Sequence, residues 1–232
     1  MKKQCASFIV ALLLSAQLLS VNGQQTAGKS RFRAAEIVSA GEIGYPAGAA
    51  AWGTLVFEVW VTAGGAVEDV EVRRALEPFT DPSVRAIKSW EFRPATLGGK
   101  AVASSVMVAA TFNPRVDFPA NVPLPPLLPE KKREPPKSAF TPADVSEAVF
   151  PVYPVGAVSP GTVALECALN EKGEVESTKV IHDFVPYTPK AVEAIARWKF
   201  TPAKLNGKPV SSRIVLAFVF PTLALPPPRN DH

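Results

Sequence analysis

The sequence offers few side chains that could carry out a reaction. It contains two histidines, His182 and His232, and two cysteines, Cys5 and Cys167. His182 and Asp183 are neighbours in the chain, whereas a catalytic arrangement needs an acid and a base that converge from different parts of the fold. The sequence also has no glycine-rich phosphate loop and no metal-ligand spacing. We therefore predict that the protein is not an enzyme and that it uses no cofactor and no catalytic metal.

Cys167 is the one cysteine outside the N-terminal segment. It lies in VALECALN, where Val163, Leu165, Cys167 and Leu169 alternate on one face of a predicted strand. A single thiol cannot close a disulfide within the chain. A buried thiol in such a position behaves as a small hydrophobic side chain.

The N-terminus has the plan of a secretory signal. Lys2 and Lys3 precede an apolar stretch from Phe8 to Leu19, and a cut after Gly23 fits the small residues that follow. The alternative is an uncleaved anchor, although the apolar stretch is short of the ~20 residues that a spanning helix needs. We therefore expect a periplasmic protein, or alternatively one anchored in the inner membrane by this segment alone and facing the periplasm.

Charge excludes one class of partner. The formal net charge is +4, and loss of Lys2 and Lys3 with the signal would reduce it to +2. The remaining basic residues are scattered along the chain, and the small cluster Lys131, Lys132 and Arg133 is flanked by Glu130 and Glu134, as in a soluble linker. The sequence therefore gives no indication of nucleic-acid binding.

A gapless internal repeat organises the chain. Shifting the sequence by 108 residues places Tyr45–Phe112 on Tyr153–Phe220, and about 40% of the positions are identical. The phrase SWEFRPATLGGKAV in the first unit returns as RWKFTPAKLNGKPV in the second. The chain therefore contains two copies of one structural unit.

Each copy predicts two strands, one helix and a third strand. An alternating run such as GTLVFEVWVT, a glycine turn and a second alternating run predict a hairpin. Asp81-Pro82 and Thr188-Pro189 predict the helix starts, and Trp90 and Trp198 end the apolar stripes that would cover the sheet. Pro94 and Pro202 prevent the helices from continuing and lead the chain toward the third strands.

The predicted fold class is α+β, with two tandem β-β-α-β units, each a three-stranded antiparallel sheet packed by one helix. The predicted segments are a signal peptide or anchor (1–23), an N-terminal linker (24–44), domain 1 (45–113), a proline-rich linker (114–141), domain 2 (142–221) and a proline-rich tail (222–232). Because each unit has its own turns, helix and tryptophan, we expect the two units to fold independently.

The order of these residues resembles the C-terminal domain of TonB-like energy transducers. The shared features are a Tyr-Pro pair, a Gly-Thr strand start, a Gly-Glu-Val hairpin, an Ala-Ile-x-x-Trp-x-Phe-x-Pro-Ala helix end and Asn-Gly-Lys-Pro-Val before the last strand. The second unit matches more completely, since the first has Gly98 and Ala101 at two of these positions. In contrast to such transducers, the proline-rich stretch here lies between two domains.

The resemblance implies a domain that binds an extended segment of an outer-membrane receptor, or of another envelope protein, along a sheet edge. Such binding could support transport across the outer membrane. It also points to the third strands, 102–112 and 210–220, as the partner-binding edges, without deciding which repeat binds. To these we add the large side chain of Trp60 on the outward face of the first unit. The predicted site residues are Trp60, Val210, Ser212, Ile214, Val215, Leu216, Ala217 and Phe218.

Two alternatives remain open at this stage. The third-strand edges could pair with each other or with a second copy of the protein, because small domains gain much from added burial. The protein could also be a secreted periplasmic adaptor or structural protein that transduces no energy. In that case Trp60 and the opposite face of the sheet would supply the contact surface.

Overall fold

The computed structural model describes residues 32–113, 121–122, 124–129, 139–154, 157 and 159–221. The helices are α1 (Thr80–Ile87) and α2 (Tyr187–Ile195). The long strands are β3 (Gly53–Val61), β4 (Val67–Arg74), β8 (Ser104–Phe112), β12 (Gly161–Leu169), β13 (Val175–His182) and β17 (Ser212–Phe220). The short strands are β1 (Phe32–Arg33), β2 (Glu36–Ser39), β5 (Glu91–Arg93), β6 (Ala95–Leu97), β7 (Lys100–Val102), β9 (Asn121–Val122), β10 (Phe140–Thr141), β11 (Asp144–Val149), β14 (Lys199–Thr201), β15 (Lys204–Leu205) and β16 (Lys208–Pro209).

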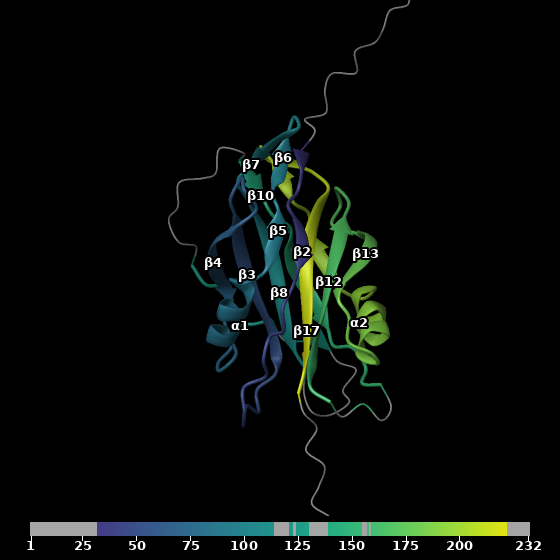
Figure 1. Cartoon of the computed structure of the whole chain (residues 1–232). Helices are drawn as coiled ribbons and strands as arrows, with labels where there is room; N and C mark the ends of the chain where they lie inside the picture. Colours follow the sequence, from purple (N-terminus) through teal and green to yellow (C-terminus); the bar gives the residue numbers. More distant parts are fainter. Residues whose placement is uncertain are drawn as a thin grey trace, which may run out of the picture.

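The six long strands form one continuous sheet in the order β13-β12-β17-β8-β3-β4 (Figure 1). Each unit contributes three antiparallel strands, as the α+β prediction requires. The two halves join where β8 and β17 pair in parallel, with Met107–Phe112 opposite Ile214–Val219. The expectation of two separate three-stranded sheets is therefore corrected to a single six-stranded sheet.

The glycine turn of each hairpin lies against the strand that follows the helix. Gly65 has φ +90° and Gly173 has φ +84°, a region that favours glycine. A Cβ at Gly173 would lie 2.5 Å from the carbonyl oxygen of Phe200, and one at Gly65 would overlap the carbonyl oxygen of Phe92. The repeated Trp-x-Phe-x-Pro phrase thus packs its backbone on a turn that only glycine can make.

The helices begin slightly earlier than predicted. Asp81 and Thr188 lie inside the first turns, and neither helix has a side-chain N-cap. Instead, the hydroxyl of Thr80 accepts a hydrogen bond from the amide of Leu76 (3.1 Å), and the hydroxyl of Thr188 accepts one from the amide of Phe184 (3.0 Å). Each threonine therefore ties its helix to the preceding loop.

The tryptophans at the equivalent position of the two repeats, Trp90 and Trp198, are core residues. Trp90 is 3% exposed and Trp198 is 5% exposed. The indole ring of Trp198 lies 5.7 Å from the ring of Phe218, and its Nε1 donates to the carbonyl oxygen of Val149 (2.8 Å). The repeated phrase therefore specifies packing, as the sequence predicts.

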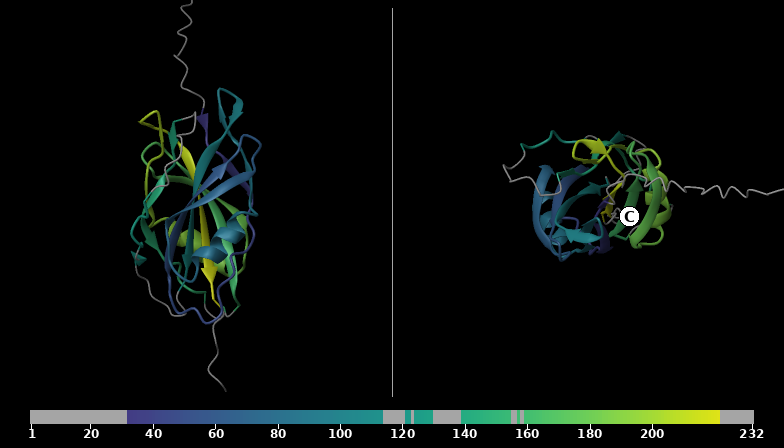
Figure 2. Two further views of the ribbon diagram at one scale, coloured as in Figure 1. Left: turned by 90° about the vertical axis from the view of Figure 1, so that its left-hand side faces the viewer. Right: turned by 90° about the horizontal axis from the view of Figure 1, so that it is seen from above.

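The two cores lie on opposite faces of the shared sheet. Leu55 and Phe57 belong to the core of the first unit, whereas Val56, between them on β3, belongs to the core of the second. Two copies of one unit that pair in parallel through the same strand are related by a half-turn about the strand direction. The half-turn places their cores on opposite faces of the sheet. Seen from above, the strands of the two units occupy opposite sides of the molecule (Figure 2).

Each unit also completes the core of the other. Ala164, Val215, Ala217 and Val219 from the second unit are buried in the core of the first, while Val56, Met107 and Ala109 from the first are buried in the core of the second. Separation of the units would expose these side chains to water. Independent folding remains a prediction, and the shared cores make it more costly than the sequence suggests.

The repeat begins further upstream than the predicted linkers allow. β1 and β2 lie inside the predicted linker 24–44 and pair with β6 and β5. In the second unit β10 and β11 pair with β15 and β14 in the same way. Residues 32–44 therefore belong to the folded first unit, and the predicted proline-rich linker contains β9 and β10.

The predicted signal segment 1–23 and tail 222–232 lie outside the described residues. Among the residues that the structure describes, neither helix is long and apolar enough to cross a membrane.

Candidate protein-binding site

The predicted site on β17 lies in the middle of the sheet. Val163 and Ala164 on β12 pair with Phe218 and Ala217 on one side of β17, and β8 pairs with Ile214–Val219 on the other. The six predicted residues from Ser212 to Phe218 are all at most 5% exposed: Ser212, Ile214, Val215, Leu216, Ala217 and Phe218. Val210 is half-buried and precedes the strand. The third strands thus pair with each other, and β17 offers no open edge in this structure.

The outward face of the first unit is also covered. Val56 is fully buried in the core of the second unit, and Trp60 is half-buried on β3. The adaptor surface suggested for this face is therefore occupied largely by the second unit.

The remaining edges of the sheet are those of β4 and β13, and the chain itself covers the first. Residues 124–129 (LPPLLP) run along β4. The amide of Leu128 donates to the carbonyl oxygen of Arg73 (2.8 Å), and the guanidinium of Arg74 donates to the carbonyl oxygen of Pro125. A segment of the predicted linker thus lies against the outer edge of β4 and is hydrogen-bonded to it.

No described strand pairs with the outer edge of β13, although β2 approaches β13 and Lys179 is bonded to Glu36. β13 pairs with β12 alone and ends the sheet. An edge strand presents backbone donors and acceptors that another extended segment can pair with. The charged side chains of Glu176 and Lys179 on β13 are exposed, and charges of this kind commonly limit unspecific edge pairing.

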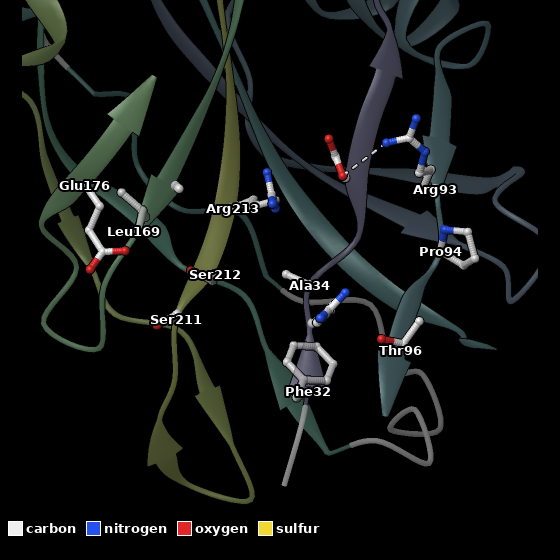
Figure 3. A pocket seen from close by; sticks show the side chains of 13 residues that line it. Phe32, Ala34, Arg93, Pro94, Thr96, Leu169, Glu176, Ser211, Ser212 and Arg213 are labelled. Atoms are coloured by element: carbon white, nitrogen blue, oxygen red, sulfur yellow. Dashed lines mark ion pairs between the residues drawn. The ribbon is translucent and has the colours of Figure 1, made fainter. Parts of the chain in front are cut away.

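A cavity of about 500 Å³ lies where the N-terminal strands of the first unit meet the second unit (Figure 3). Its walls are β1, β2 and the segment from Arg93 to Thr96 on one side, and the ends of β12 and β17 with Glu176 of β13 on the other. Its guanidinium groups are partly neutralised within the chain, since Arg93 lies 3.4 Å from Glu36 and Arg213 lies 2.5 Å from Glu166.

These charges hold the two units together. Glu166 is 2% exposed, and its second carboxylate oxygen accepts a hydrogen bond from the amide of Ile37 (2.9 Å). The hydrogen bond from Lys179 is the main cause that lowers the pKa of Glu36; the nearby positive charges of Arg213, Lys179 and Arg93 act in the same direction, while burial opposes them. The described lining of the cavity contains the hydroxyl groups of Ser211 and Ser212 but no histidine that could act on them as a base.

The side chains that could have done chemistry are placed as structural residues. Cys167 is buried, and burial raises the pKa of its thiol to about 12. Such a thiol carries almost no thiolate near neutral pH and is a poor nucleophile. His182 lies at the end of β13, 4.0 Å from the carboxylate of Glu42. Among the described residues no group of histidine, cysteine and acidic side chains could hold a metal ion.

The fold and its sheet edges define a protein-interaction module. A family model described as the Gram-negative bacterial TonB protein C-terminal domain matches residues 44–114 and 151–222. The chain therefore belongs to the TonB C-terminal domain family, a non-enzymatic protein-interaction family whose domains are periplasmic and contact envelope proteins such as outer-membrane receptors. A search of curated proteins found no match.

Sequence reasoning missed the β13 edge and the segment that covers β4. Both depend on which strands are neighbours in the sheet, a property that alternation along one strand does not report. One signal was present: Ile214–Phe220 is an uninterrupted apolar run, a pattern typical of a strand buried on both faces.

Proposed function

We propose that the chain is a cell-envelope binding module that takes up an extended segment of a partner protein along the outer edge of β13. The observation that carries this proposal is that β13 ends the sheet with no described strand paired on its outer side. The equivalent end of the sheet, β4, already holds an extended segment of the chain. The partner is an outer-membrane receptor or another envelope protein, in keeping with the family.

Strand addition at β17 is the less favourable site. It would require β8 to leave β17, with loss of the paired stretch Ile214–Val219 and exposure of side chains that are now buried. β13 can accept a partner without breaking any pairing that the structure contains. For this reason the proposed site moves from the third strand of the second unit to its second strand.

The proposal is tested by blocking one outward amide of β13. Of two adjacent residues in an edge strand, one amide points to the neighbouring strand and the other points away. Ser177→Pro and Thr178→Pro are therefore matched variants, of which one loses a bond to β12 and the other loses only an outward donor. We expect the variant with the outward proline to keep its far-UV circular dichroism and to lose binding.

Binding is measured by titrating the full chain with extended peptides from candidate outer-membrane receptors. Ser177→Thr and Thr178→Ser are the controls, and both should bind as the parent does, because backbone pairing supplies most of the affinity. If both proline variants remain folded and bind as the parent does, edge addition at β13 is wrong.

Export and the role in transport belong to the same proposal. We propose that the segment 1–23 directs the chain to the periplasm, and that a cleaved, soluble form acts as an adaptor without energy transduction. The closed pairing of β8 with β17 favours the adaptor, because it occupies the edge to which the transducer resemblance points. N-terminal sequencing of the protein from fractionated cells decides between an adaptor and a transducer. A chain that starts near Gln24 in the soluble fraction supports the adaptor, whereas an intact Met1 in the membrane fraction supports the transducer.

A further inference from the structure

The two ends of the sheet are related by the repeat, and only one of them is covered by a described segment. The offset of 108 residues places Arg73 and Arg74 of β4 on Ile181 and His182 of β13. The segment bound at the outer edge of β4 therefore shows which backbone conformation the equivalent outer edge of β13 can accept.

The segment on β4 is held mainly through its backbone. Its six residues LPPLLP contain three prolines, which lack an amide donor and favour extended conformations. One described amide, that of Leu128, pairs with β4, and the carbonyl of Pro125 is bound by Arg74. Leu124 is half-buried against the core of the second unit, whereas Leu127 and Leu128 remain 52% and 40% exposed, so these last two side chains contribute little burial at the edge of β4.

The β13 edge and the elements that follow it expose more apolar side chain than the equivalent β4 edge of the first unit. Val180 on β13 is 43% exposed, Val185 in the following loop is 74% exposed and Val192 on α2 is 39% exposed. At the equivalent positions of the first unit, Val72 and Val84 are only partly exposed, and Glu77 replaces Val185. Val180 pairs with Leu165 of the second core, so it lies on the face of the sheet that α2 covers, and the three valines come from successive elements on that face. Exposed apolar side chains on one face are typical of a protein-contact region.

We infer that the β13 edge recognises an extended, proline-containing segment whose remaining residues are apolar, held by backbone pairing like that of Leu128 on β4. This inference rests on the proposed function and gives the chemical class of the partner. Proline lowers the entropic cost of ordering the segment, while leucine-like side chains would cover the three exposed valines. Because Lys179 on β13 is already paired with Glu36, the strand offers little charge to a strongly charged partner.

The test uses the full chain and a fluorescent peptide with the sequence of residues 121–130, NVPLPPLLPE. A second peptide, NVPSPPSSPE, keeps the prolines and replaces each leucine by serine. Val180→Glu disrupts the apolar edge of β13, and Val152→Glu is the matched control, since Val152 is 45% exposed and belongs to no strand. Fluorescence anisotropy measures binding, and light scattering reports any self-association.

We expect the leucine peptide to bind the parent chain and Val152→Glu equally, and to bind Val180→Glu at least about tenfold more weakly. The serine peptide should also bind at least about tenfold more weakly. Equal binding to Val180→Glu would show that the peptide displaces residues 124–129 from β4, and would overturn the inference. A dimer that Val180→Glu dissociates, without peptide binding, would assign the edge to a second copy and would also overturn it.

The two experiments together distinguish a failure of the inference from a failure of the proposed function. If both peptides bind equally and the outward proline variant of β13 abolishes both, strand addition at β13 stands and the apolar class is wrong. If neither peptide binds while a receptor peptide does, the proline-containing class is wrong. If no peptide of any kind binds in either experiment, the proposed function fails together with the inference.

Discussion

Replacing Trp198 by alanine is expected to lower the free energy of unfolding by about 3–5 kcal/mol. The side chain is 5% exposed and packs against Phe218 of the central strand. Its removal would leave a large cavity and deprive the carbonyl oxygen of Val149 of its donor. Urea unfolding followed by circular dichroism measures the change.

The repeat supplies a matched control for this prediction. The Nε1 of Trp90 has no hydrogen-bond partner among the described residues, whereas that of Trp198 donates to Val149. Phenylalanine at either position keeps an aromatic ring and removes the indole N–H. Trp198→Phe should therefore cost about 1 kcal/mol more than Trp90→Phe through the lost hydrogen bond. A melting temperature that Trp198→Ala leaves unchanged would contradict the core assignment.

Proline at either Leu216 or Ala217 is expected to unfold the chain or to destabilise it by about 3 kcal/mol or more. Both residues lie in β17, where neighbouring amides point alternately to β12 and β8, so each substitution removes a paired donor. Ala217 also lies between Ala164 and Ala110 in the register, all at most 1% exposed, which leaves no space for a shifted strand.

The comparison with β13 makes this prediction specific. In an edge strand one of two adjacent positions tolerates proline, whereas in a central strand neither does. Urea unfolding of Leu216→Pro, Ala217→Pro, Ser177→Pro and Thr178→Pro gives the four values. If one of the β17 variants is as stable as the parent, β17 has an open edge and the parallel pairing with β8 is wrong.

The local elements of this fold could be predicted from the sequence, and their assembly could not. Alternation in GTLVFEVWVT and the glycine at position 65 indicate a hairpin because they report side-chain direction and turn geometry. The pairing of β8 with β17 depends on contacts between residues 107 positions apart, such as Met107 and Ile214. Such contacts leave only an indirect trace, the long apolar run of β17.

The upstream strands show the same limit. Phe32 and Phe140 correspond under the offset of the repeat, and their rings lie 4.5 Å apart at the junction of the units. The segments around them have little sequence identity, so they were predicted as linkers. Short strands such as β1 and β10 are held by their partners β6 and β15 and carry too little periodicity to be recognised alone.

Residue-resolved amide hydrogen exchange tests the central claim that the third strands close on each other and leave β13 as the free edge. In a central strand every amide is hydrogen-bonded, whereas an edge strand exposes every second amide to water. We predict that all amides from Val215 to Val219 exchange slowly, and that alternate amides of β13 exchange quickly and slow down when a partner peptide is added. Alternating fast and slow exchange along β17, with uniform protection along β13, would contradict the account.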